Sequence, residues 1–393
     1  MCSKELDKKM GTFRASTDNA PSVCSSRRVP IFFTVFLAAA SLSAQSVNLK
    51  IDFAKDSPVT PLSVESGDST ATARGGAYQV NVHASLSLRN LSQKKIRGIT
   101  MAVLAQEVTP GGKGSVSIPS LDVTPNDAFT VRIDVPLIRP LSAGQGAPAV
   151  EVRLDGVLFE DLSFYGPDSL HSKHNMTLWE LEARRDRKYF KSVLETAGDT
   201  GLRNEMLRSL SREADRQQQQ PGVQMVRGRS TNFDAGQDVQ FAFLDIPESP
   251  AEALDGTARI TSDGARAPRF EVRNRSTRPI RSLEIGWLVK DQQGREFLAA
   301  SLPAEANLAP GKTGQVLEQD TALKFRDSTN ISTMRGFVSN VEFADGGYWI
   351  PSRAIIDDPK LRSLVAPSPE EQRLAQIYRK KGLAALVEEL KKF

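Results

Sequence analysis

Residues 87–104 read SLRNLSQKKIRGITMAVL, and residues 271–289 read EVRNRSTRPIRSLEIGWLV. In each stretch a strand-like run ends at an asparagine, a polar turn follows, and an aliphatic run begins at an isoleucine. The two asparagines, Asn90 and Asn274, lie 184 residues apart, and the same spacing relates many residues further along the chain: Arg89/Arg273, Ser92/Ser276, Ile96/Ile280, Arg97/Arg281, Leu104/Leu288, Ser117/Ser301, Pro119/Pro303, Val157/Val341, Phe159/Phe343, Asp161/Asp345, Pro167/Pro351 and Gly198/Gly382. This shared register predicts that one structural unit is duplicated in tandem.

Residues 1–44 have the layout of a secretory signal peptide. Arg27 and Arg28 precede the uncharged run VPIFFTVFLAAASL, and the small residues Ser41, Ser43 and Ala44 follow it. A positive region, a short apolar region and a small-residue cleavage site are typical of such signals, and this run is shorter than a membrane span. We therefore expect an exported protein, periplasmic or extracellular, whose mature chain begins after Ala44. A start at Met10 and an uncleaved anchor remain open alternatives, and neither changes the expected export.

The positions of the cysteines and the balance of basic and acidic residues exclude several classes of protein. Cys2 and Cys24 both precede the expected cleavage point, so the mature chain has no cysteine for a disulfide, a lipid anchor or thiol chemistry. Without residues 1–44, the 51 basic and 47 acidic residues of the chain become 45 and 44. This near-neutral balance gives no support to nucleic-acid or anionic-membrane binding, and we expect no membrane span in the mature chain.

Alternating apolar residues predict a series of short strands. The clearest run is residues 78–88, and the strand after it is matched between the copies. Turn sequences separate the runs at residues 110–112, 125–127 and 155–156, and no helical pattern lies between them, as a parallel α/β fold would require. The pattern therefore predicts an antiparallel β-sandwich, with these residues on its inner face: Tyr78, Val80, Val82, Ala84, Leu86, Leu88, Ile99, Met101, Val103, Phe129, Val131, Ile133, Val135, Val150, Val152, Leu154, Val157 and Phe159, and in the second copy Leu283, Ile285 and Trp287.

A helical composition follows each sandwich. Residues 177–219 are rich in Leu, Glu, Arg and Gln at helical spacing, and we expect Gly198 and Gly201 to divide them into two helices. In the second copy Gly382 separates residues 370–381 from 383–392. The predicted organisation is a signal peptide (1–44), a first sandwich (45–168), a helical segment (169–220), a linker (221–238), a second sandwich (239–357) and a C-terminal helical segment (358–393).

The run FEVRNRSTRPIRSLEIGWLVKDQQGREF, followed by NLAPGKTG, resembles the bacterial Ig-like modules of exported proteins, of the FxLYD and CARDB (cell-adhesion-related) kinds. The shared features are a strand ending in Val-x-Asn, a short polar turn, an aliphatic strand, a glycine turn and a Pro-Gly loop. The Phe-x-Leu-Tyr-Asp signature and the helical segments depart from those modules. The resemblance implies a mainly β fold with α appendages: two tandem Ig-like antiparallel β-sandwiches, each followed by a helical hairpin, in a non-catalytic exported protein.

Motifs for catalysis and metal binding are absent from the sequence. His171 and His174 have only Asp168 as a nearby acidic partner, so we expect a solvated loop rather than a metal site. Neither G-x-S-x-G, H-E-x-x-H nor a Walker spacing occurs. We therefore expect no enzyme, no cofactor, no bound metal and no catalytic residues.

Two pairs of polar residues recur at equivalent positions. Asp161 and Asp345 are expected to close turns by accepting backbone N–H groups, although a cation is the alternative. Asn90 and Asn274 each begin an Asn-x-Ser glycosylation sequon, and turn formation explains their placement at least as well.

The candidate interaction surface combines aromatic residues at the sandwich ends with the apolar face of the C-terminal helices. We expect the aromatic pairs at residues 164–165 and 348–349 to pack the helices onto the sandwich, with an exposed patch as the alternative. The C-terminal apolar face must also be covered, by its own sandwich, by the first helical pair or by another chain. The residues proposed for this surface are Tyr165, Tyr348, Trp349, Leu374, Tyr378 and Leu386.

The sequence therefore favours an exported, non-enzymatic binding, scaffold or assembly protein, with a protein partner or self-association. The alternative is a hydrolase or a carbohydrate-binding accessory protein that uses a groove between sandwich and helices. The identity of the partner and the oligomeric state are left open.

Overall fold

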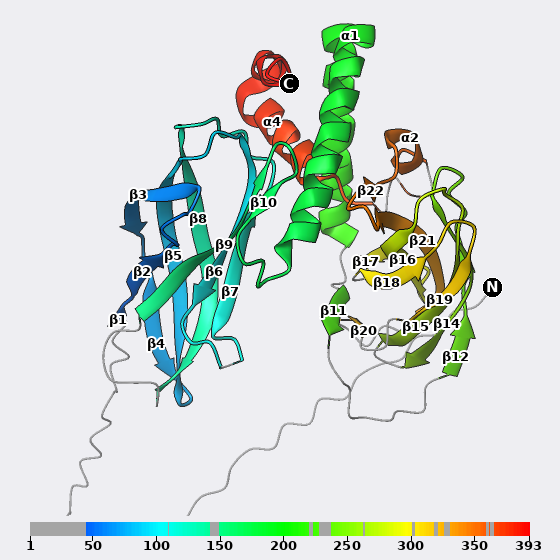
Figure 1. Cartoon of the computed structure of the whole chain (residues 1–393), viewed down its shortest axis with the longest axis horizontal. Helices are drawn as coiled ribbons and strands as arrows, with labels where there is room; N and C mark the ends of the chain where they lie inside the picture. The colour runs from blue at the N-terminus through cyan, green and yellow to red at the C-terminus, as the bar shows by residue number, and fades with distance from the viewer. Residues whose placement is uncertain are drawn as a thin grey trace, which may run out of the picture. The chain divides into compact units, whose positions relative to one another are not determined.

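The computed structural model describes residues 45–108, 110–141, 149–219, 223–227, 237–261, 264–300, 303–317, 321–325, 331–358, 361 and 365–393. In these residues the protein is mainly β, and its strands form four sheets accompanied by few helices. Figure 1 shows their arrangement. The expected signal peptide lies outside the described residues.

The first two sheets are built from residues 45–165. One contains β1 (Gln45–Ser46), β4 (Thr70–Arg74), β5 (Ala77–Asn90), β3 (Val59–Ser66) and β8 (Ala128–Pro140). The other contains β10 (Phe164–Tyr165), β9 (Ala149–Phe159), β6 (Ile96–Leu104), β7 (Lys113–Ile118) and β2 (Asn48–Asp52). Both sheets contribute to one hydrophobic core, which includes Val80, Leu86, Met101, Val131 and Val152. The alternation of β5 is confirmed, because Val80, Val82, Leu86 and Leu88 are fully buried.

The third and fourth sheets are built from residues 223–349. The third contains β11 (Val223–Arg227), β20 (Thr321–Phe325), β15 (Gly264–Asn274), β14 (Ala251–Thr261), β12 (Gln237–Gln240) and β19 (Thr313–Leu317). The fourth contains β13 (Ala242–Phe243), β21 (Ile331–Phe343), β16 (Ile280–Asp291), β17 (Glu296–Ala300), β18 (Ala304–Leu308) and β22 (Tyr348–Trp349). Their core surrounds Trp287, which is fully buried against Phe241, Phe243 and Phe270, on the inward side expected for it.

The strand pairing departs from the sequence expectation in two places. β2 pairs with β9, and β13 with β21, in parallel rather than antiparallel orientation. The turn expected at Asp155-Gly156 is an irregularity inside the continuous strand β9, where the register against β6 shifts by one residue. A bulge leaves its extra residue outside the ladder. The Asp155 side chain accordingly turns away to accept hydrogen bonds from Ser169 and Leu170.

Two long helices follow the paired sheets. α1 (Ser172–Gln219) and α4 (Pro369–Leu390) each contain one glycine with non-helical backbone angles, Gly198 (φ 62, ψ −164) and Gly382 (φ 81, ψ −178). These angles lie in a region that is essentially restricted to glycine, so each helix is divided there into two segments. The expected break at Gly198 is confirmed, whereas Gly201 lies within the helix. A short helix, α2 (Arg353–Ile356), precedes α4.

α1 covers the outer face of β6. All nine residues of β6 are buried, although alternation alone would leave every second one exposed. Met176 of α1 lies against Gly98, and its sulfur accepts a 3.0 Å hydrogen bond from Thr100 Oγ1. Among the described residues, no helix is both long and apolar enough to cross a membrane.

Candidate functional site

The two repeated asparagines hold identical turns. Asn90 and Asn274 are fully buried, and each side-chain oxygen accepts hydrogen bonds from the backbone N–H and the hydroxyl of the serine two residues later. Each side-chain Nδ2 donates to the carbonyl four residues later and to the carbonyl of a neighbouring strand end, Val123 or Leu308. With the amide enclosed and bonded in this way, turn formation explains both sequons.

The repeated carboxylates close turns as the sequence predicted. Asp161 accepts the backbone N–H of Ser163 and pairs with Lys94, and Asp345 accepts the backbone N–H of Gly347 and pairs with Arg278. The hydrogen bond from Lys94 is the largest of the effects that hold the pKa of Asp161 below its usual range. Both acids are thus engaged by a cation of the protein itself.

The apolar face of α4 packs on α1. Leu374, Leu386 and Leu390 are buried against Phe190, Leu202 and Met206. These six residues are three pairs in the 184-residue register: Phe190/Leu374, Leu202/Leu386 and Met206/Leu390. Tyr378 packs at the edge of the same cluster. The contact that Leu374, Tyr378 and Leu386 make is therefore intramolecular, with the first helical segment.

A buried ionic cluster lies beside this apolar contact. Arg353 of α2 is 7% exposed, and its guanidinium lies 2.7 Å from Glu371, 3.2 Å from Asp357 and 3.3 Å from Asp186. The guanidinium also lies over the Tyr189 ring, 4.6 Å from its centroid. A buried cation keeps its charge only when several anions and hydrogen bonds replace water, as they do here. Arg353 thus joins α2 to both long helices.

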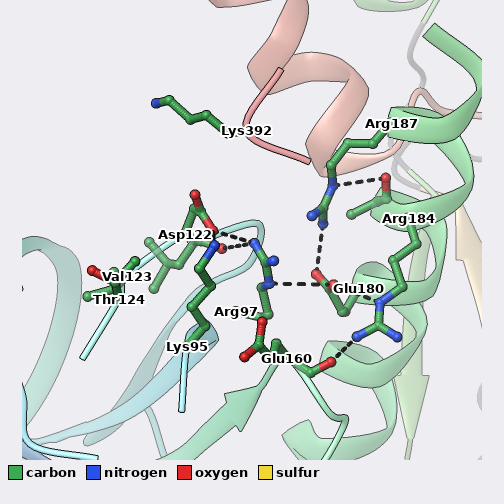
Figure 2. A network of polar contacts seen from close by, with 12 residues as sticks. Lys95, Arg97, Asp122, Val123, Thr124, Glu160, Glu180, Arg184, Arg187 and Lys392 are labelled. Atoms are coloured by element: carbon green, nitrogen blue, oxygen red, sulfur yellow. Dashed lines mark hydrogen bonds and ion pairs between the residues drawn. The ribbon is translucent and has the colours of Figure 1, made fainter. Parts of the chain in front are cut away.

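A second network joins α1 to the second sheet (Figure 2). Arg97 of β6 lies between Asp122, at 2.7 Å, and Glu180 of α1, at 3.8 Å. Glu180 also pairs with Arg184 and Arg187 of its own helix, both at 3.0 Å. The Arg187 guanidinium lies 4.3 Å from the centroid of the Phe393 ring, so the chain after α4 meets the same network.

The aromatic pairs occupy different environments. Tyr165 is half-buried at the edge of the first core, and its hydroxyl donates a 3.0 Å hydrogen bond to Asp56. Trp349 packs against the second core and against Ile246, Phe337 and Leu361. Tyr348 contacts the His174 ring of α1 edge to face, with centroids 5.5 Å apart. The Tyr348 contact joins the fourth sheet to α1.

Titratable groups gather where α1 meets the fourth sheet. His174 lies 3.5 Å from Glu342 and 3.8 Å from Glu284. Burial lowers the pKa of His174, although Glu342 opposes this effect. Burial also raises the pKa of Glu284 to about 7, with Asn340 opposing and Glu182 of α1 adding to the shift. The expected loop position of the two histidines holds for His171, which precedes α1, but His174 lies within the helix.

A cavity of about 480 Å³ opens at this junction. Its wall comes from the start of α1 and the turn before it, and from β16, β21 and β22. Within the described residues, no group of three or more histidine, cysteine or acidic side chains is arranged to hold a metal ion. The lining residues are Leu162, Asp168, His171, Lys173, His174, Thr177, Arg281, Glu342, Gly346 and Tyr348.

The sequence pattern did not identify Arg353, Asp186 and Asp155, whose side chains connect separate elements of the fold. Their partners lie far along the chain or in a bulge, so no local spacing reveals them. One local signal was present: Ser368 followed by Glu371 is a capping-box pattern, and Ser368 Oγ does accept the Glu371 backbone N–H at the start of α4.

Comparisons with known proteins give little further guidance. No family model matches the chain, and no curated protein matches it. Among solved structures, it is similar to a β-glucosidase from Kluyveromyces marxianus in complex with glucose, with a TM-score of 0.16 and 10% identity over 70% of this chain and 46% of that one. A selenomethionine-labelled form of that enzyme gives a TM-score of 0.15 and 9% identity over 69% of this chain and 45% of that one. The chain therefore spans less than half the length of these structures, and a likeness this weak carries no argument about fold or function.

Proposed function

We propose that this chain is an exported, non-enzymatic binding, scaffold or assembly protein of the periplasm or cell surface. We further propose that it consists of two tandem Ig-like β-sandwiches, each followed by a helical hairpin. The equal hydrogen bonding of Asn90 and Asn274, and the equal backbone breaks at Gly198 and Gly382, support the duplication.

The observation that carries the binding function is a repeated exposed leucine. Leu62 of β3 is 45% exposed and Leu254 of β14 is 43% exposed. They lie 192 residues apart, the spacing that also relates Ser57 to Ser249, whose side chains make the same two hydrogen bonds to the backbone two residues later.

Both leucines sit at a β-bulge. The register of β3 against β5 shifts between Pro61 and Ser63, and that of β14 against β15 shifts between Ala253 and Asp255. Bulges re-aim a side chain and interrupt pairing at sheet edges. The recurrence of a large exposed apolar side chain at two equivalent bulges supports a surface that a binding partner uses twice.

The helical segments pack on each other, so we propose that the partner binds the sheets rather than the C-terminal helices. Because the apolar face of α4 is covered by α1, it has no need of a second chain. The helices then act as a strut that holds two binding modules in one chain, which suits a scaffold.

The test is site-specific photocrosslinking in cells that export the protein. A photoreactive residue at position 62 or 254 is expected to capture the same discrete partner. Position 207 is the control, because Leu207 is also exposed, at 51%, but position 391 in the 184-residue register holds a lysine. Leu62→Asp with Leu254→Asp should abolish capture, and Leu207→Asp should not. Cytoplasmic protein that keeps residues 1–44, or equal capture from all three positions, would contradict the proposal.

The alternative function is a hydrolase or a carbohydrate-binding accessory protein. The cavity between the start of α1 and the fourth sheet is the observation that favours it. Its test is turnover or saturable binding of neutral oligosaccharides by the purified protein, which the leading proposal does not require.

A further inference from the structure

The cavity at the start of α1 lies between two equivalent turns. Leu162 and Gly346 occupy the same position in the 184-residue register, both have positive φ (64° and 80°), and both line the cavity. Leu162 lies in the turn between β9 and β10, and Gly346 lies in the turn between β21 and β22. A volume of about 480 Å³ is within the range of small-molecule sites in proteins.

The two carboxylates of the wall are already bonded to the protein. Glu342 accepts a 3.2 Å hydrogen bond from Arg281 and a 3.0 Å hydrogen bond from the hydroxyl of Ser282. Asp168 accepts the backbone N–H of Lys173 at 2.9 Å and so caps α1. Both acids are therefore engaged by groups of the protein itself.

Three side chains of the wall can donate hydrogen bonds to a ligand: Lys173, His171 and Arg281. Within the part of the chain that the structure describes, the Lys173 ammonium and the His171 ring have no hydrogen-bond or ion-pair partner. Arg281 uses Nη1 for Glu342, and its side chain remains 62% exposed. A lysine offers three N–H donors and an arginine five, with no acceptor on either.

We propose that this cavity binds a small ligand through an oxyanion, a phosphate or carboxylate group, held by Lys173, His171 and Arg281. Cationic donors bind such groups through short charge-assisted hydrogen bonds, and a ligand that supplies acceptors satisfies the donors that the wall leaves free. Lys173 and Arg281 belong to different parts of the chain, so the bound ligand bridges α1 and the fourth sheet.

This inference goes beyond the proposed partner binding and does not depend on it. The leucines at positions 62 and 254 lie on other elements, so crosslinking there and ligand binding here are separate observations. A failed ligand test leaves the scaffold proposal standing, and the reverse also holds.

The experiment is isothermal titration calorimetry of the purified protein with inorganic phosphate and, separately, with succinate, at an ionic strength kept constant with sodium chloride. Lys173→Gln with Arg281→Gln is the test variant. Lys188→Gln with Arg335→Gln is the matched control, because these two exposed cations lie on α1 and β21 and do not line the cavity. Lys173→Gln alone is the second test variant. Lys173 is exposed, so this variant is expected to fold even if the double variant does not.

We expect saturable binding of at least one anion, weakened by about tenfold or more in the test variant and unchanged in the control. The anion that binds identifies the phosphate or the carboxylate as the recognised group. Equal weakening in both variants would reveal a general salt effect and overturn the proposal. So would the absence of saturable heat with either anion, or saturable binding of a neutral trisaccharide in their place, which would assign the cavity to the alternative function.

Discussion

Ser368 donates a 2.6 Å hydrogen bond from its hydroxyl to Asp186, and the same hydroxyl accepts the backbone N–H of Glu371. Asp186 is fully buried in α1, and Ser368 is the N-cap of α4. One hydroxyl group therefore begins the second long helix and attaches it to the first. An N-cap side chain usually accepts only a backbone N–H from the first turn of its own helix. Because Ser368 also donates to Asp186 of α1, it couples the formation of α4 to the packing of α4 on α1.

Arg353→Met is expected to destabilise the protein by about 3–5 kcal/mol, because it leaves Asp186 and Glu371 buried without their shared cation. Chemical denaturation followed by circular dichroism measures the loss. Arg335→Met, at an exposed arginine of β21, is the control and should change the free energy of unfolding by about 0.5 kcal/mol or less. An equally small effect of Arg353→Met would mean that the ionic cluster adds nothing to stability.

Leu386→Ala should cost about 2–5 kcal/mol, the usual range for truncating a fully buried leucine. Leu386 is fully buried between α4 and α1, whereas Leu207 is 51% exposed on α1. Leu207→Ala is therefore the matched control and should leave the melting temperature nearly unchanged. If the two variants melt alike, the packing of α4 on α1 is not the stable state of the protein in solution.

Asn274→Ala is expected to cost about 2–4 kcal/mol, since it removes the two hydrogen bonds that the buried amide donates to carbonyls and the two that it accepts from Ser276. Asn90→Ala should cost a similar amount, because its hydrogen bonds are the same in kind. Thermal melting of the two variants measures both effects. A large loss at one asparagine and none at the other would contradict the equivalence of the two turns.

Gly382→Ala should destabilise the protein by about 1–3 kcal/mol through backbone strain alone. A methyl group at this position would lie more than 4 Å from the packed residues around the helix, so a clash with neighbouring elements is not the cause. Gly198→Ala is expected to behave in the same way, because its added methyl is equally free. Denaturant unfolding of both variants checks this, and unchanged stability would show that the helix break does not require glycine.

Glu284 is expected to make the stability of the protein depend on pH near neutrality. Its folded-state pKa of about 7 is above the ordinary value of 4.5, so the folded protein holds a proton that the unfolded chain releases between these values. This contribution is fully present below about pH 4.5 and is lost as the pH rises through about 7.

Glu284→Gln should therefore reduce the fall in stability between pH 5 and pH 8, by on the order of 2 kcal/mol. Denaturation at each pH measures the difference from the parent protein. Glu305→Gln, at an exposed glutamate of β18, should leave the pH profile unchanged. Identical profiles for the parent protein and Glu284→Gln would show that this carboxyl titrates normally.

Local patterns predicted much of the fold. The alternation of Val80, Val82, Leu86 and Leu88 identified the buried face of β5, because a period of two needs no knowledge of distant residues. The glycine break at Gly198 and the turn roles of Asn90 and Asp161 were also predictable, since each depends on neighbours within a few residues.

Features set by distant contacts could not be predicted. Burial of the outer face of β6 depends on Met176, which lies far along the chain, and the parallel pairing of β2 depends on β9. The environment of Arg353 depends on Asp186 and Glu371, in two different helices. Asp155 looked like a turn residue because Asp-Gly favours turns, but pairing with β6 kept the strand continuous around it.

The packing of α4 on α1 determines how the fold responds to a low protein concentration. Both helices belong to one chain, so their association is an intramolecular step with a fixed effective concentration. A dimer made by two separate copies of such helices would dissociate as the protein became scarce. Here the packing of the two helices does not depend on the protein concentration, so it persists when only a few molecules are present.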